Sequence, residues 1–187
     1  MVAGFAVYSL DAIIGAIYYL MHDMIVKALL FLIGGAMIGI TGTNNLKKMS
    51  GLIRNHPLLG WMFFIGALAV AGIPPLSGFV GKLLITQGAL GKGAEIPFFY
   101  ALAAIGLLSS LMVLYSMMKI FTNGFWGETL LSKNMEKIDT KGLIFPCMFL
   151  LSIIIFLGLG GEVLYPYLEQ ASHALLNPEI YIKAVLE

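Results

Sequence analysis

Long apolar runs constrain this chain more than any other feature of its sequence. Several of them reach about 20 residues or more, among them 12–40, 98–121 and 142–162. A helix of about 20 residues rises about 30 Å, which matches the hydrocarbon core of a bilayer. Only 11% of the residues are charged, which is less than half of the roughly 25% found in soluble domains. The runs therefore predict an all-α integral membrane protein.

The polar segments between the runs give the expected order of helices. We expect about four full transmembrane helices and one partial helix at the N-terminal end, and Asp11 is expected to cap the first full helix. These helices would form a membrane domain over residues 1–168, followed by an extramembrane tail over 169–187. The expected spans are 1–9, which is partial, and 12–40, 58–90, 98–121 and 142–162.

The run over 58–90 is too long for one straight helix and contains Gly72-Ile-Pro-Pro-Leu-Ser-Gly78. Proline removes a backbone donor and clashes with the preceding turn of a helix. We therefore expect one span broken at Gly72–Gly78, with a half-helix on each side. Two separate spans are the alternative, but each half has only about 13 residues, fewer than the roughly 17 that a bilayer requires.

The basic residues of the loops predict an orientation. With the broken run counted as one span, the loops 41–57 and 122–141 lie on the same side of the membrane. The positive-inside rule places such loops in the cytoplasm and therefore the C-terminal tail outside. The basic residues of these loops are Lys47, Lys48, Arg54, Lys133, Lys137 and Lys141.

Charged side chains inside two of the spans are the main candidate functional residues. A lysine or aspartate at the centre of a membrane helix costs about 2.5–3.5 kcal/mol on insertion scales. Lys27 lies about halfway along the first full span, Asp23 precedes it by one helical turn on the same face, and His22 is adjacent. Lys82 lies in the second half-helix of the broken span. We predict that these four residues form part of a proton pathway.

Each of these candidates also has a purely structural interpretation. An Asp23–Lys27 ion pair could serve only to fix helix packing, and Lys82 could extend to the membrane interface. The functional interpretation is favoured because ionisable residues inside membranes are usually functional. The unwound loop supports it, because broken helices of transporters place backbone groups at ion sites. The loop residues assigned to the site are Gly72, Pro74, Pro75, Ser77 and Gly78.

Other classes of site have no signal in the sequence. The net charge of +1 gives no field that would attract nucleic acid, and the single cysteine, Cys147, lies in an apolar run. The sequence has no phosphate-binding loop, dinucleotide motif, nucleophile elbow or zinc spacing. We therefore expect no cofactor, no bound metal, no nucleic-acid partner and no enzymatic active site in this chain.

Two segments carry a family resemblance. His22-Asp-Met-Ile-Val-Lys27-Ala-Leu-Leu-Phe-Leu-Ile-Gly-Gly35 resembles the lysine-bearing helix of the proton-translocating, antiporter-like membrane subunits, and Gly72-Ile-Pro-Pro-Leu-Ser-Gly-Phe-Val-Gly-Lys82 resembles their broken helix near the C-terminus. That family includes the large membrane subunits of respiratory complex I and subunits of Mrp-type Na+/H+ antiporters. The flanking segments 51–57, 115–128 and 177–183 are most similar to the D-type member of the Mrp antiporters.

The resemblance implies inverted repeats of five helices, each with a broken helix and a central lysine. Lys27 matches the lysine of the second repeat, and Lys82 matches the ionisable residue on its broken helix. His22 matches a histidine beside that lysine, whereas Asp23 replaces what is usually a second histidine. Family members are much longer than this chain, which resembles their C-terminal portion.

The function that this resemblance implies is ion transport in the cell membrane. The chain would be a subunit, or a fragment of one, of a multisubunit monovalent cation/proton antiporter, with part of a proton pathway coupled to Na+ export. Its partners would be other subunits of a hetero-oligomeric complex, membrane lipid, H+ and Na+. The alternatives are a homologous membrane-arm subunit of complex I or of a membrane-bound hydrogenase, and a truncated product that does not transport.

Overall fold

The computed structural model describes residues 1–128, 141–177, 179 and 182. All regular elements among these residues are helices. Three segments are long and apolar enough to cross a membrane by length and composition, namely Leu10–Thr41, Phe98–Gly124 and Gly142–Leu159. The predicted all-α membrane fold is confirmed.

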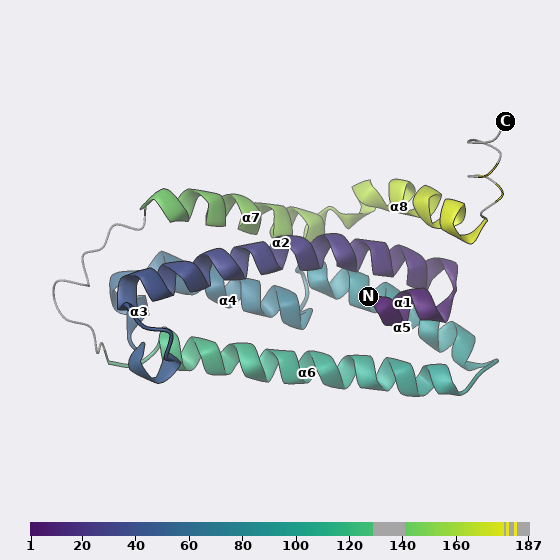
Figure 1. Ribbon diagram of the computed structural model, residues 1–187. Helices are drawn as coiled ribbons and strands as arrows, with labels where there is room; N and C mark the ends of the chain where they lie inside the picture. Colours follow the sequence, from purple (N-terminus) through teal and green to yellow (C-terminus); the bar gives the residue numbers. More distant parts are fainter. Residues whose placement is uncertain (129–140, 178, 180–181, 183–187) are drawn as a thin grey trace.

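The long helices lie side by side (Figure 1). Helices α4 (Pro57–Ala71) and α5 (Ser77–Gly93) follow each other end to end along α2 (Leu10–Thr41). Helix α6 (Phe98–Gly124) packs on α4 and α5, whereas α7 (Lys141–Leu159) lies on the other side of α2 from α6 and contacts α2, α4 and α5. The broken pair α4–α5 is therefore enclosed between α2 and α6.

Short helices connect and extend this bundle. The element α1 (Val2–Val7) precedes α2, and the connection after α2 contains η1 (Leu46–Lys48) and α3 (Leu52–Asn55). Helix α8 (Gly161–Leu176) follows α7 after Gly160. The predicted loop 122–141 falls largely on residues outside the described ones.

The start of α2 differs from the prediction. The N-cap is Ser9, whose side-chain oxygen accepts a hydrogen bond from the backbone N–H of Ala12 at 3.3 Å. Asp11 lies inside the first turn. Serine and aspartate are both good N-caps, and the chain direction changes earlier than expected because Tyr8 adopts a left-handed conformation with φ 52°.

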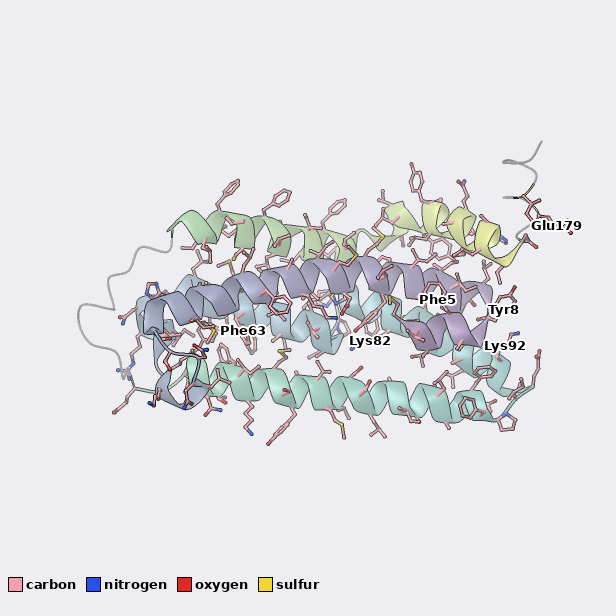
Figure 2. All side chains as sticks on the ribbon, viewed as in Figure 1. Phe5, Tyr8, Phe63, Lys82, Lys92 and Glu179 are labelled. Atoms are coloured by element: carbon pink, nitrogen blue, oxygen red, sulfur yellow. The ribbon has the colours of Figure 1, made fainter. Side chains whose placement is uncertain are left out.

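The largest buried cluster joins α2, α4 and α7 with the end of α6, where several aromatic rings meet. The rings of Phe63 and Phe125 have centroids 5.2 Å apart, and Phe121 stacks on both. The Phe125 carbonyl also accepts a hydrogen bond from the backbone N–H of Ile53 at 3.0 Å, which ties α3 to the end of α6. Figure 2 shows Phe63 well away from Lys82 along the bundle, so these aromatic rings hold the scaffold together outside the candidate site.

Helices α2 and α5 make the most extensive contact in the bundle. Small residues allow membrane helices to approach closely, and glycines occur on both sides of this contact. A Cβ atom at Gly15 would lie 2.7 Å from the backbone N of Ile85, and one at Gly81 would lie 2.9 Å from Cβ of Tyr19. This approach brings the first half of α5, with Lys82, against the middle of α2.

Candidate functional site

The site is built around the break between α4 and α5. Helix α4 ends at Ala71, where Gly72 adopts a left-handed conformation with φ 83° that glycine tolerates without a Cβ penalty. Helix α5 begins at Ser77. The predicted break is confirmed, but the unwound segment covers only 72–76. Ser77 and Gly78, which were assigned to the loop, belong to the first turn of α5.

The two prolines of the unwound segment free two specific carbonyls. In a continuous helix, the carbonyls of Val70 and Ala71 would accept hydrogen bonds from the N–H groups of residues 74 and 75. Both of these residues are proline, which has no N–H. The Nζ atom of Lys82 donates to both carbonyl oxygens instead, each at 2.9 Å. The C-terminal end of α4 is also the negative end of its helix dipole, which stabilises a cation at this position.

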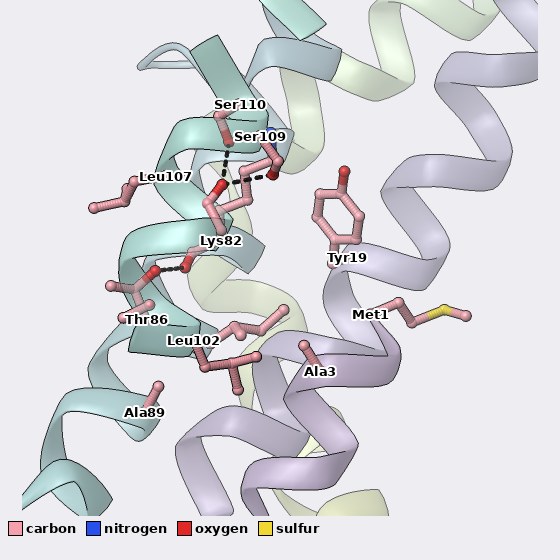
Figure 3. A pocket seen from close by; sticks show the side chains of 13 residues that line it. Met1, Ala3, Tyr19, Lys82, Thr86, Ala89, Leu102, Leu107, Ser109 and Ser110 are labelled. Atoms are coloured by element: carbon pink, nitrogen blue, oxygen red, sulfur yellow. Dashed lines mark hydrogen bonds between the residues drawn. The ribbon is translucent and has the colours of Figure 1, made fainter. Parts of the chain in front are cut away.

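A third oxygen completes the surroundings of the Lys82 ammonium. Its Nζ atom donates to Oγ of Ser110 on α6 at 2.9 Å. An ammonium group has three N–H donors, so each of them has an acceptor here. The Tyr19 ring lies below it, with its centroid 5.8 Å from Nζ. Figure 3 shows Lys82 between Tyr19 and the two serines of α6, in a pocket of about 200 Å³ that Thr86 also lines.

His22 connects α2 to the break. Its side chain is buried, and its Nδ1 atom lies 2.7 Å from Oγ of Ser77, the first residue of α5. Its Nε2 atom is buried and has no hydrogen-bond partner among the described residues. A Cβ atom at Gly78 would lie 2.8 Å from this nitrogen and would collide with the carbonyl oxygen of Ala69. Only glycine at position 78 therefore leaves room for His22 between the ends of the two half-helices.

Lys27 and Asp23 lie apart from this group. The Nζ atom of Lys27 is 2.7 Å from Oδ2 of Asp23, and the Lys27 side chain is 61% exposed. Lys27 borders a second pocket, which Phe31 and Met37 also line. The predicted His22–Asp23–Lys27 cluster is therefore divided: His22 binds at the break, and the ion pair lies on an open face of α2. Asp23 remains close enough to interact electrostatically with both His22 and Lys82.

Several parts of the site were not among the predicted residues. The Val70 and Ala71 carbonyls could have been found, because the prolines four residues later identify acceptors that lose their helical partner. Ser110 gave no such signal, since its side chain reaches Lys82 only through the way α6 packs on α5. No group of three or more His, Cys, Asp or Glu side chains that could hold a metal ion occurs in the part of the chain that the structure describes.

The chain also matches known proteins. The family model described as NADH:quinone oxidoreductase/Mrp antiporter, transmembrane, matches residues 1–104, which include Lys27, the break and Lys82. The match covers more than half of the 187 residues. The chain belongs to this family. The resemblance to antiporter-like membrane subunits is thus confirmed, and with the apolar helices it makes the chain a multi-pass membrane protein.

Two relatives within the family cover nearly all of the chain. It is 48% identical over 184 residues to the D subunit of the Na(+)/H(+) antiporter of Bacillus subtilis, a match over 98% of the chain and 36% of the relative. It is 46% identical over 187 residues to the protein of the same name from Alkalihalophilus pseudofirmus, over 100% of the chain and 37% of the relative. The chain spans little more than a third of these relatives.

A solved structure supports the same assignment. The structure of the Mrp complex from Dietzia sp. DQ12-45-1b contains a chain that superposes with a TM-score of 0.83 and 31% sequence identity. The superposition covers 98% of this chain and 41% of the Dietzia chain. The predicted position of the chain within its longer relatives, at their C-terminal end, stays a prediction.

Proposed function

We propose that this chain is part of a subunit of a multisubunit monovalent cation/proton antiporter, and that it carries part of a transmembrane proton pathway. One observation carries the proposal: the Lys82 ammonium is held at a helix break by two carbonyls that have lost their helical partners. Lys82 lies near the middle of the bundle (Figure 2). A charged group inside a membrane is costly, and the ionisable residues found there are usually functional. The names of the relatives in Bacillus subtilis and Alkalihalophilus pseudofirmus support the exchange of Na+ for H+.

The arrangement suggests separate tasks for the ionisable residues. Lys82 would exchange a proton with the adjoining pocket, and Lys27 would act as the central relay along α2. His22 lies on α2 against the break, where its Nδ1 atom contacts Ser77, and its buried Nε2 atom makes no hydrogen bond of good geometry among the described residues. A neutral imidazole carries one donor and one acceptor nitrogen, so His22 can pass a proton beside the break. Asp23 would hold the Lys27 side chain in place through their ion pair.

The proposal also covers the setting of the chain. Residues 1–168 would be the membrane domain and residues 169–187 an extramembrane tail on the outside, with the loops 41–57 and 122–141 in the cytoplasm. The membrane would be the cell membrane, and the partners would be other subunits of the complex, lipid, H+ and Na+. The chain would be a transporter component without an enzymatic active site of its own.

Transport assays on the complete complex test the proposal. Everted membrane vesicles would carry wild-type complex, Lys82→Ala or Lys27→Ala, and Na+ addition would be followed with a pH-sensitive dye. We expect both variants to lose most of the Na+-dependent proton movement, because each removes a proton-carrying group. Lys92→Ala is the matched control, since Lys92 is on the same helix as Lys82 but near the end of the bundle (Figure 2). Normal transport in both test variants would contradict the proposal.

A second candidate follows from the family description, which also includes NADH:quinone oxidoreductase. In that case the same helices would pump protons driven by redox chemistry in another subunit. Vesicles with NADH and quinone, but without a sodium gradient, separate the two functions. Proton movement on NADH addition that is insensitive to Na+ and is lost in Lys82→Ala would favour the oxidoreductase.

A further inference from the structure

The three oxygens around the Lys82 ammonium differ in one chemical respect. The carbonyl oxygens of Val70 and Ala71 can only accept hydrogen bonds, whereas the Ser110 hydroxyl can accept or donate. The Oγ atom of Ser110 lies 2.9 Å from Nζ of Lys82 and 3.2 Å from the carbonyl oxygen of Gly106. With Lys82 charged, the hydroxyl donates its hydrogen to Gly106 and accepts one from the ammonium.

The hydrogen-bond partners that Nζ of Lys82 needs change when the side chain gives up a proton. The neutral amine nitrogen has a lone pair, which needs a donor, and neither carbonyl can supply one. The Ser110 hydroxyl can, because rotation about its Cβ–Oγ bond turns the O–H group from Gly106 toward Nζ while the heavy atoms stay in place. The two carbonyls can accept N–H groups in both protonation states, and Ser110 is the one oxygen of the three that can bond to either the third N–H or the lone pair that replaces it.

We propose that Ser110 is a positioning residue that holds Lys82 at the helix break in both its ammonium and its amine form. The proposal rests on the proposed function, in which Lys82 exchanges a proton during each transport cycle. In the amine form the two remaining N–H groups can still donate to the two carbonyls. Without a donor, however, the lone pair of Nζ would have no hydrogen-bond partner at the break. With Ser110, only a hydroxyl rotation accompanies the proton.

Other ionisable groups also act on Lys82 and need to be kept constant. From α2 these are Tyr19, His22 and Asp23. The described pocket lining contributed by α6 has no ionisable side chain, and α4 has none in its sequence. A Ser110 variant leaves all of these groups in place. A change in the pH dependence of transport or of Lys82 labelling would therefore be caused by loss of the Ser110 hydroxyl.

The adjacent serine offers a matched control. The Ser109 hydroxyl donates to the Gly106 carbonyl at 2.7 Å and lines the pocket beside Ser110. Ser109→Ala removes the same atoms from the same turn of α6 but leaves the Ser110–Lys82 bond. Ser110→Thr keeps the hydroxyl, and threonine also bonds well to the carbonyl one turn earlier in a helix.

Two measurements on the complete complex test the proposal. The first is the rate of Na+-driven proton movement in vesicles as a function of pH. The second needs no transport: the solubilised complex is treated with an amine-reactive reagent at a series of pH values, and mass spectrometry gives the labelled fraction of Lys82. Ser110→Ala should shift both curves toward lower pH by about one unit, because the bond lost by the charged form is stronger than that lost by the neutral form. The maximal rate should fall several-fold.

The control variants decide the outcome. We expect Ser110→Thr to restore both curves and Ser109→Ala to match the wild type. The proposal is overturned if Ser110→Ala matches Ser109→Ala in both measurements. It is also overturned if Ser110→Thr is as impaired as Ser110→Ala in a complex that assembles normally. Should the labelling curve shift while wild-type vesicles show no Na+-driven proton movement, Ser110 keeps its assignment and the antiporter proposal fails.

Discussion

Two lysines of this chain stand in opposite surroundings. Lys82 is held by three oxygens from two other helices, whereas Lys27 contacts the carboxylate of its own helix and is mostly exposed. Met24 and Phe31, large apolar residues one heptad apart on α2, are exposed near Lys27. The described helices thus give the half-buried Lys82 ammonium three acceptors and leave the Lys27–Asp23 pair without cover. Since such a pair is costly in lipid, we expect protein to cover the Lys27 face of α2 in the complete complex.

The largest effect is expected from a methyl group at the break. Gly78→Ala places Cβ against the Ala69 carbonyl and the His22 ring, so the half-helices must move apart. We expect a loss of stability of about 1–3 kcal/mol, measured as a lower temperature of complex dissociation.

An exposed glycine of α2, Gly35, provides the control for Gly78→Ala. A Cβ atom at Gly35 meets no atom within 4 Å in the described chain. Gly35→Ala should therefore leave the fold of this chain intact. If it lowers the dissociation temperature as much as Gly78→Ala does, the exposed side of α2 at Gly35 is packed as tightly in the complex as the break is, which would contradict the expected difference between the two positions.

Restoring backbone donors at the break should have the next largest effect. The double change Pro74→Ala and Pro75→Ala supplies two N–H groups that compete with Lys82 for the Val70 and Ala71 carbonyls. We expect transport to fall several-fold while the complex still assembles. Pro57→Ala is the control, because proline in the first turn of α4 takes the place of an N–H that has no helical partner. Unchanged transport in the double variant would show that the prolines are not needed to free these carbonyls.

A smaller effect is expected from the exposed ion pair. Exposed pairs in water contribute about 0.2–1 kcal/mol, so Asp23→Asn should change stability little if the Lys27 face meets water. If the face is covered by apolar protein, the unpaired Lys27 becomes much more costly. We would compare the dissociation temperatures of Asp23→Asn, Lys27→Met and the double variant. The difference between the double variant and the sum of the single variants measures the interaction between Asp23 and Lys27. An interaction near zero would contradict the expectation that protein covers the Lys27 face of α2 in the complex.

The smallest effect concerns His56, which precedes α4 in the connection after α2. Burial lowers the pKa of its imidazole below the ordinary value of 6.5. The unfolded chain therefore binds a proton before the folded chain does, and stability should decrease as the pH falls below about 6.5. His56→Gln should remove this part of the pH dependence, as measured by dissociation temperature between about pH 7.5 and 5.5. An identical pH dependence in the variant would exclude His56 as its source.

The sequence predicted the break better than it predicted the site. Glycine and proline act through the local backbone, so Gly72-Ile-Pro-Pro was sufficient to predict a broken span. The Asp23–Lys27 pair was also local, because residues one turn apart share a helix face. The contact between His22 and Ser77 joins residues far apart in sequence, as does that between Lys82 and Ser110. Both depend on how α2 and α6 pack on α5, which the helical periodicity of one sequence does not determine.

The spacing of the proline pair and the lysine has a consequence for engineering. Each residue added to a helix turns everything after it by about 100°. One residue inserted between Ser77 and Lys82 would therefore point the ammonium away from the freed carbonyls, although every side chain of the motif were still present. The spacing within residues 70–82 must therefore be kept unchanged, and chimaeras between family members should be joined outside this segment.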